Sequence, residues 1–235
     1  MTSEWILSQL TPTAPGFWLA LSLLTLPVAL FLGVRISERS RRWLYAARWV
    51  LIPYAGLLAG GLSPRLMGLS KIDWATTLSL GMALFFGLTA LAFGVRIFIA
   101  STEKAEDGGH GVLVSETRAG WATSMILVLM IGAEQFHWTF IRGAIWELLL
   151  TWPQPLSGRL AYWAIWIATI LTLPGVWLQP ISIPRKLIKS TLLVMTAIVF
   201  FYTRNFWLAW LLHVTAWFLL TQRIPRTMED VEYSG

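Results

Sequence analysis

Three residues with ionisable side chains stand out because they lie inside a long apolar stretch. Glu134, His137 and Arg142 occur between residues 120 and 150, among Met, Ile, Leu, Val and Trp residues. A charge at the centre of a bilayer costs roughly 2.5–3.5 kcal/mol on insertion scales. Charged residues at that depth are usually buried against partners inside the protein, so this stretch is the predicted functional site.

The spacing of these residues places them on one face of a helix. With about 100° per residue, His137 lies about −60° and Arg142 about +80° from Glu134. His213, near the middle of a later apolar run, reaches the same depth as Glu134 if the two helices are neighbours. A carboxylate with two histidines could activate water, bind a metal or form a neutral hydrogen-bonded network. The alternative is structural: Glu134 and Arg142 satisfy each other as a buried pair, and each histidine donates to a backbone carbonyl.

Metal chemistry has little support in the sequence. Glu134-x-x-His137 has the spacing found in carboxylate-bridged di-iron bundles, but such bundles need two copies and further glutamates. The chain contains no cysteine, which excludes disulfides, thiolate ligands and a cysteine nucleophile. Glycine-rich phosphate loops and nucleophile elbows are also missing. No metal ligand is therefore predicted, and Glu147 receives no role.

The composition defines the class of protein. Hydrophobic residues make up 56% of the 235 residues and charged residues 13%, and apolar runs long enough to span a bilayer recur along the chain. We expect one all-α, polytopic membrane domain over residues 1–235. The seven predicted transmembrane helices are 17–34, 43–62, 75–99, 120–150, 160–178, 187–203 and 206–221. The N-terminus lacks the basic start of a cleavable signal peptide, so the first run is expected to remain as a helix.

The basic residues predict the orientation in the cell membrane. The connections after the first, third, fifth and seventh helices contain Arg35, Arg39, Arg41, Arg42, Arg96, Lys104, Arg118, Arg185, Lys186, Lys189, Arg223 and Arg226. The opposite connections contain only Arg65, Lys71, Arg159 and Arg204. This positive-inside bias places the N-terminus outside, and the loop 101–117 and the C-terminus in the cytoplasm. Topology accounts for the pI of about 10.1, so nucleic acid is not an expected partner, whereas anionic lipids are.

Two segments of the second half of the chain resemble a known family. Phe140-Ile-Arg-Gly-Ala-Ile-Trp-Glu-Leu-Leu and Asn205-Phe-Trp-Leu-Ala-Trp-Leu-Leu-His-Val-Thr-Ala-Trp217 look like the CPBP family. These are the CAAX-prenyl-protease and bacteriocin-processing-like intramembrane proteins. Their pattern is Glu-Glu-x-x-x-Arg-Gly on one helix, Phe-x-x-x-His on another and a late His-x-x-x-Asn. The resemblance implies a CPBP-like helical bundle, in which active members use a glutamate and histidines to activate water for peptide cleavage.

The match to the first motif is incomplete. If Arg142-Gly143 is the family's Arg-Gly, then His137 and Trp138 occupy the positions of the paired glutamates. If Glu134-Gln135 is the glutamate pair, its second member is an amide and Arg142 comes three residues late.

The two histidine motifs are incomplete as well. His213 fits the late histidine, but Trp217 stands where the family has asparagine. No Phe-x-x-x-His occurs between the two matched segments. A site with one glutamate and two histidines would therefore have to use His137 in an unconventional way.

The resemblance and its departures together favour a CPBP-like protein that has lost proteolysis. The expected role is a binding or assembly subunit of a complex with other integral membrane proteins. The first alternative is an active intramembrane endopeptidase with Glu134 as base, His137 and His213 as ligands of water or metal, and Arg142 as the partner of Glu134. The second alternative is a membrane subunit in which His137 or His213 ligates a pigment or haem. Gln135, Trp138 and Trp217 are expected to support the site in each case, and the identity of any cofactor stays open.

Overall fold

The computed structural model describes residues 3–33, 35–105, 121–152 and 159–221, which form helices and contain no strand. The helices are α1 (Ser3–Ser8), α2 (Pro15–Gly33), α3 (Glu38–Leu58), α4 (Trp74–Thr76), the π-helical segment η1 (Thr77–Gly81), α5 (Met82–Ala105), α6 (Trp121–Leu150), α7 (Leu160–Trp177), α8 (Ile183–Thr203) and α9 (Phe206–Thr221). The all-α, polytopic membrane architecture expected from the sequence is confirmed.

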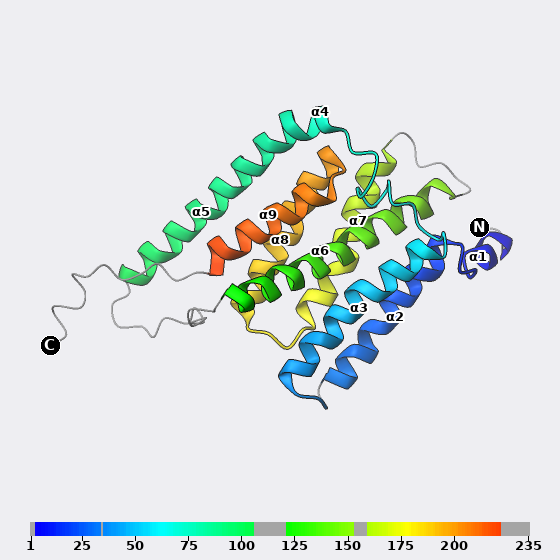
Figure 1. Cartoon of the computed structure of the whole chain (residues 1–235), viewed down its shortest axis with the longest axis horizontal. Helices are drawn as coiled ribbons and strands as arrows, with labels where there is room; N and C mark the ends of the chain where they lie inside the picture. The colour runs from blue at the N-terminus through cyan, green and yellow to red at the C-terminus, as the bar shows by residue number, and fades with distance from the viewer. Residues whose placement is uncertain (1–2, 34, 106–120, 153–158, 222–235) are drawn as a thin grey trace.

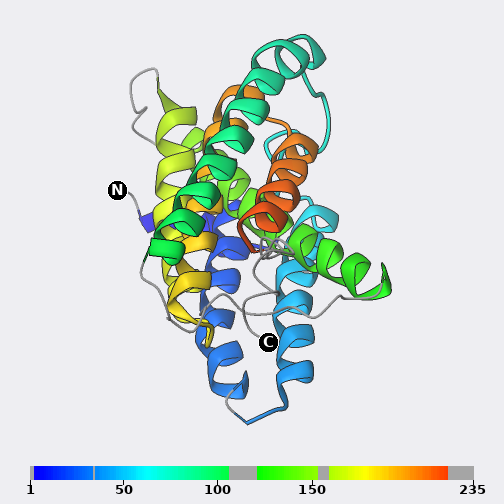
Figure 2. The same cartoon turned by 90° about the vertical axis from the view of Figure 1, so that its left-hand side faces the viewer.

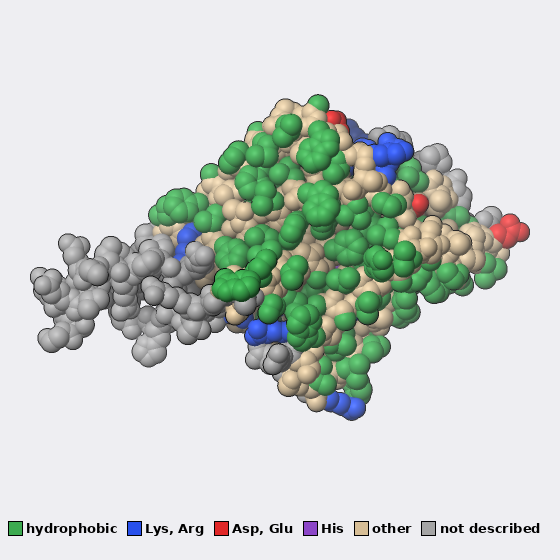
Figure 3. Space-filling model, in the orientation of Figure 1, with side chains coloured by type: hydrophobic (Ala, Val, Ile, Leu, Met, Phe, Trp, Pro, Cys, Tyr) green, Lys and Arg blue, Asp and Glu red, His purple; other side chains and the backbone are tan. Residues whose placement is uncertain are grey.

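Five helices in the described part of the chain are long and apolar enough to cross a membrane. They comprise Pro15–Gly33, Trp74–Ile97, Thr123–Leu150, Leu160–Trp177 and Ile183–Thr203. The shorter helix α9 is also apolar, whereas α3 has membrane-spanning length but contains several arginines. Large apolar side chains cover much of the surface (Figure 3), and Leu24, Phe86 and Ile170 are each more than half exposed. In lipid this exposure carries no penalty, because acyl chains are as apolar as these side chains.

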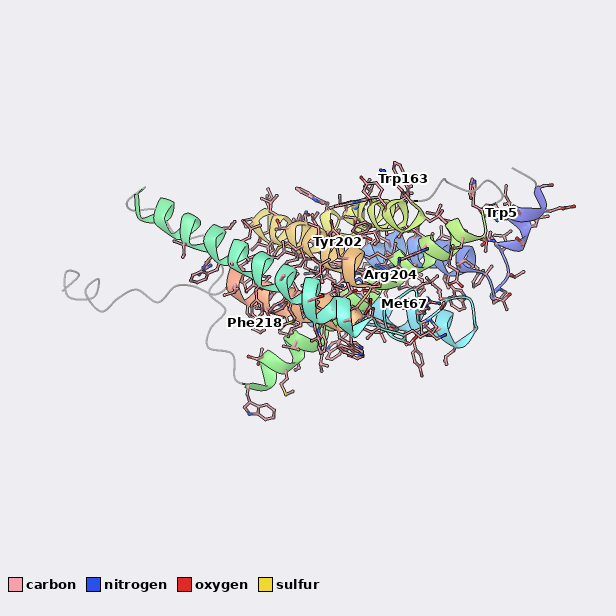
Figure 4. The ribbon with its side chains drawn as sticks, turned by 90° about the horizontal axis from the view of Figure 1, so that it is seen from above. Trp5, Met67, Trp163, Tyr202, Arg204 and Phe218 are labelled. Atoms are coloured by element: carbon pink, nitrogen blue, oxygen red, sulfur yellow. The ribbon has the colours of Figure 1, made fainter. Side chains whose placement is uncertain are left out.

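Helix α6 lies at the centre of the bundle. It packs against α2 and α3 on one side and against α7 and α9 on the other (Figure 1). No described side chain from Ile131 to Trp146 is exposed, whereas none is buried between Trp121 and Met130. The first third of α6 accordingly projects away from the other helices, as Figures 2 and 4 show.

Two helix boundaries differ from those predicted from hydropathy. Helix α3 begins at Glu38 rather than near residue 43, because the side chain of Ser37 accepts a hydrogen bond from the backbone N–H of Ser40 and caps a polar first turn. Helix α8 begins at Ile183 rather than near residue 187, with Pro184 in its first turn. Both early turns contain basic residues, which a hydropathy average excludes from a span.

The connection between α3 and α4 folds back onto the turn between α8 and α9. Gly68 has φ 68°, and a Cβ there would lie 2.5 Å from the carbonyl oxygen of Arg204. The backbone N–H of Phe206 donates to the carbonyl of Gly68 at 3.0 Å, and Met67 and Arg204 lie close together in Figure 4. Because only glycine fits this close approach, the loop is fixed at one end of the bundle.

Candidate functional site

The polar centre of the bundle is an ion pair between α6 and α8. The Nζ atom of Lys189 lies 2.7 Å from Oε1 and 2.8 Å from Oε2 of Glu134. It also donates to Oε1 of Gln179 at 3.1 Å, from the turn that precedes α8. All three residues are buried. The carboxylate of Glu134 therefore meets an ammonium group that engages both of its oxygens.

Two tryptophans flank this ion pair. The Nζ atom of Lys189 lies 5.4 Å from the ring centroid of Trp49 in α3 and 5.9 Å from that of Trp217 in α9. Ammonium groups within about 6 Å of an indole face are attracted by the ring quadrupole. Trp217, which was expected to support the site, thus lies beside Lys189, and four parts of the chain contribute to the environment of one lysine.

His213 is next to this pair but meets an amide rather than a carboxylate. Its Nδ1 atom lies 3.2 Å from Oε1 of Gln135, whose Nε2 donates to Oγ1 of Thr139 at 3.4 Å. With the amide oxygen facing the ring, this contact is a hydrogen bond in the tautomer that carries the proton on Nδ1. Trp138 stacks on the ring of His213 with centroids 4.7 Å apart and planes at 10°. Gln135 and Trp138 thus both contact the ring of His213 directly.

Arg142 does not pair with Glu134, contrary to the expectation from helical spacing. Its Nη2 atom donates to the carbonyl of Leu193 and to Oγ1 of Thr196, both at 3.1 Å. Its Nε and Nη1 atoms have no hydrogen-bond partner in the described part of the chain. Arg142 lies about two turns past the midpoint of α6 and meets the second half of α8, whereas Lys189 is the residue that pairs with Glu134.

His137 faces a different environment from that of His213. It is buried, its Nδ1 atom has no partner among the described residues, and its ring lies 6.1 Å from that of Phe140. The guanidinium group of Arg48 in α3 acts on it electrostatically. Within the ranges described, no three His, Cys, Asp or Glu side chains form a group that could hold a metal ion. The glutamate and the two histidines that the sequence suggested as one set therefore each meet a different partner.

Several residues at the centre were missed by the sequence reasoning. Lys189 was assigned to a cytoplasmic loop, but it lies inside α8 and is buried against Glu134. Pro184 was a usable signal, because a helix that begins beside it places Lys189 in its second turn. Arg48, inside the second predicted helix, was not considered; it donates to Oγ1 of Thr25 and to the carbonyl of Ser22.

Two other charged residues have roles that bear on the fold. Glu147, which received no role from the sequence, accepts a hydrogen bond from the backbone N–H of Ser63 at 2.9 Å. Arg96 was assigned to a cytoplasmic connection, but it is buried within α5 and donates to the carbonyl of Leu220 at 3.4 Å. The loop 101–117 lies mostly outside the described residues.

Comparisons with known proteins do not extend this description. No protein-family model, curated protein or solved structure matches the chain.

Proposed function

We propose that this chain is a CPBP-like membrane protein that binds other integral membrane proteins, as an assembly subunit of a larger complex, without cleaving them. The observation that carries the proposal is the buried Lys189–Glu134 pair. A glutamate that activates water needs an oxygen directed at that water. Both oxygens of Glu134 are instead within 2.8 Å of one ammonium group.

Releasing the glutamate for catalysis would be costly. Breaking a buried ion pair leaves an uncompensated charge, and removal of one partner costs about 3–5 kcal/mol. The two histidines do not offset this free-energy cost. His213 is hydrogen-bonded to Gln135, and Arg48 acts electrostatically on His137. The contacts between Lys189 and Glu134 are explained by a structural role, in which the ion pair holds α6 to α8.

The first third of α6 supplies a surface for a partner. Its exposed side chains are mostly apolar, with Trp121 79%, Met125 58% and Leu129 67% accessible. This segment projects from the bundle in Figures 2 and 4. An apolar transmembrane helix of another protein can pack along it through van der Waals contacts, which drive helix association in lipid.

The proposal is tested with a variant that removes the charges but keeps the volume. Glu134→Gln combined with Lys189→Met replaces the pair without leaving a lone charge. We expect the partner proteins that co-purify with the wild type to remain bound to this double variant, whereas Leu129→Lys on the projecting part of α6 releases them. Peptide cleavage by the purified wild type that the double variant lacks would establish the protease instead.

Ligation of a pigment or haem is a second candidate. The Nε2 atom of His213 and the Nδ1 atom of His137 have no hydrogen-bond partner in the described part of the chain, and a neutral imidazole nitrogen of this kind can ligate a metal. The absorption spectrum of gently solubilised protein is the test. A visible band that disappears in His213→Gln or His137→Gln would support ligation, and a colourless preparation would exclude it.

We further propose that the protein lies in the cell membrane with its N-terminus outside. Support comes from the basic connection between α2 and α3 and from the start of α8, which lie at the end of the bundle away from α1 (Figure 1). Because the chain lacks cysteine, single-cysteine variants report accessibility without background. We expect Ser8→Cys to react with an impermeant maleimide on intact cells, and Ile36→Cys to react only after permeabilisation. The reverse labelling pattern would show that the N-terminus lies in the cytoplasm and that the proposed orientation is wrong.

A further inference from the structure

A basic and aromatic stripe lies on the face of α3 that packs against α2. Its members are Arg41, Tyr45 and Arg48, at spacings of four and three residues, which place them along one side of a helix. Arg48 is fixed to α2 by hydrogen bonds of 3.1 Å and 2.8 Å to Oγ1 of Thr25 and the carbonyl of Ser22. The stripe therefore has a fixed orientation toward its neighbour.

Arg41 and Tyr45 converge on Gly33 at the end of α2. A Cβ placed on Gly33 would lie 3.3 Å from Cδ of Arg41 and 3.7 Å from the hydroxyl oxygen of Tyr45. Because Gly33 has no side chain, the aliphatic part of Arg41 and the phenol ring of Tyr45 both lie over its backbone. This arrangement positions two hydrogen-bond donors from successive turns of α3 beside each other.

The hydroxyl group of Tyr45 has no partner. Tyr45 is only 7% exposed, and its hydroxyl oxygen makes no hydrogen bond in the described part of the chain. Arg41 and Arg48 both act electrostatically on this group. Among the side chains that the structure describes, no carboxylate pairs with any member of the stripe. A buried donor between two cations is thus suited to an anionic oxygen.

The position of the stripe identifies the class of anion. Arg41 lies in the first turn of α3, and Tyr45 lies one turn deeper, so both are near the end of the α2–α3 hairpin. Phe31 and Leu32 of α2 are exposed beside them and can contact acyl chains. A phosphate at the headgroup level, attached to acyl chains that extend along α2, satisfies the polar and the apolar parts together.

We propose that Arg41 and Tyr45 bind one phosphate group of an anionic glycerophospholipid, above Gly33 at the α2–α3 hairpin. The guanidinium group supplies charge-assisted hydrogen bonds to the phosphate oxygens. The Tyr45 hydroxyl donates to one of the two non-bridging oxygens, and Arg48 adds a fixed positive charge from below. This inference does not depend on the proposed assembly role.

The test is binding of defined lipids to the purified full-length protein. Native mass spectrometry resolves the first bound lipid during titration with dioleoyl-phosphatidylglycerol or dioleoyl-phosphatidylcholine. We expect tighter binding of the phosphatidylglycerol, weakened about tenfold by Arg41→Gln and about fivefold by Tyr45→Phe. If Arg41→Gln does not fold, Tyr45→Phe carries the test, because it removes only one oxygen atom.

Arg35→Gln is the matched control for net charge. Arg35 lies at the same end of the hairpin, with its guanidinium carbon 4.0 Å from the centroid of the Phe31 ring. Binding of phosphatidylglycerol should change by no more than about twofold in this variant, since it leaves the Gly33 site intact. An equal loss in Arg35→Gln and Arg41→Gln, or equal affinity for both lipids, would show diffuse attraction and overturn the proposal. Displacement of the lipid by millimolar glycerol phosphate would reassign the site to a soluble phosphate.

Discussion

Two basic regions of the bundle, one around Lys189 and one around Arg41 and Arg48, accommodate positive charge in different ways. Lys189 in α8 has its own carboxylate, and the pair is buried and neutral as a unit. Arg41 and Arg48 in α3 lie against neutral groups of α2 instead, next to the unpartnered hydroxyl of Tyr45. The comparison shows that a buried polar residue is not by itself a functional site. We propose a structural role for the region whose charges are internally satisfied, and ligand binding for the region without a described counter-charge.

The largest expected effect comes from a single substitution that removes one member of the Lys189–Glu134 ion pair. Glu134→Gln leaves the ammonium group of Lys189 without a counter-charge, and we expect the free energy of unfolding to fall by about 3–5 kcal/mol. The double variant Glu134→Gln/Lys189→Met should regain most of this loss. Denaturant unfolding in detergent, followed by tryptophan fluorescence, measures both. Equal losses in the single and double variants would mean that the ion pair does not hold α6 to α8.

A smaller effect is expected from the amide beside the ion pair. Gln135→Leu removes the acceptor of the His213 Nδ1–H group, and a buried donor left without a partner costs about 1–3 kcal/mol. The same unfolding experiment measures this loss. Thr139→Val is the matched control, because it removes only the 3.4 Å contact to the other end of the amide. A loss in Thr139→Val as large as that in Gln135→Leu would contradict the assigned orientation of Gln135.

Arg142 provides a further test of this comparison, because it is buried and has no carboxylate partner among the described residues. Two of its three guanidinium nitrogens have no partner in the described residues. Arg142→Met keeps an unbranched apolar stem and removes the buried charge, so we expect stability to change by no more than about 1 kcal/mol. Thermal unfolding of the purified protein provides the measurement. A loss comparable with that of Glu134→Gln would reveal a counter-charge for Arg142.

The smallest expected effect concerns an exposed carboxylate outside the spans. The hydroxyl and the backbone N–H of Thr76 donate to Asp73 and hold the pKa of its carboxyl below 3.8. Because the folded pKa is lowered, the capping contribution is complete above pH 3.8 and is lost as the pH falls through the lowered value. The amide resonance of Thr76 should shift only below pH 3.8. In Asp73→Asn it should stay constant, and a transition near neutral pH would contradict this account.

The fold was largely predictable from the sequence, because hydropathy and length define membrane helices with little interference from tertiary contacts. The ranges 75–99 and 120–150 correspond to η1–α5 and α6. Boundaries failed where capping extended a helix into polar residues, as at Glu38 and Ile183. These failures share one cause, since an average over a window does not register a cap.

The site was less predictable, because helical spacing gives the face of a residue but not its partner. The angles from Glu134 correctly placed Arg142 and His137 within one broad arc, yet each meets a different helix. The positive-inside rule assigned Lys189 to a cytoplasmic connection, because the rule counts basic residues without regard to whether they point into the bundle. Which helices are neighbours is set by packing, and one sequence does not contain that information in a local pattern.

The order of synthesis gives the α6–α8 pairing a further consequence. Lys189 follows Glu134 by 55 residues along the chain. At roughly 5–20 residues per second, the ribosome needs about 3–11 seconds to make that stretch. During this interval the newly inserted acid has no ammonium group to meet. The cell's insertion machinery must therefore shelter it, or leave it protonated, until the later helix enters the bilayer.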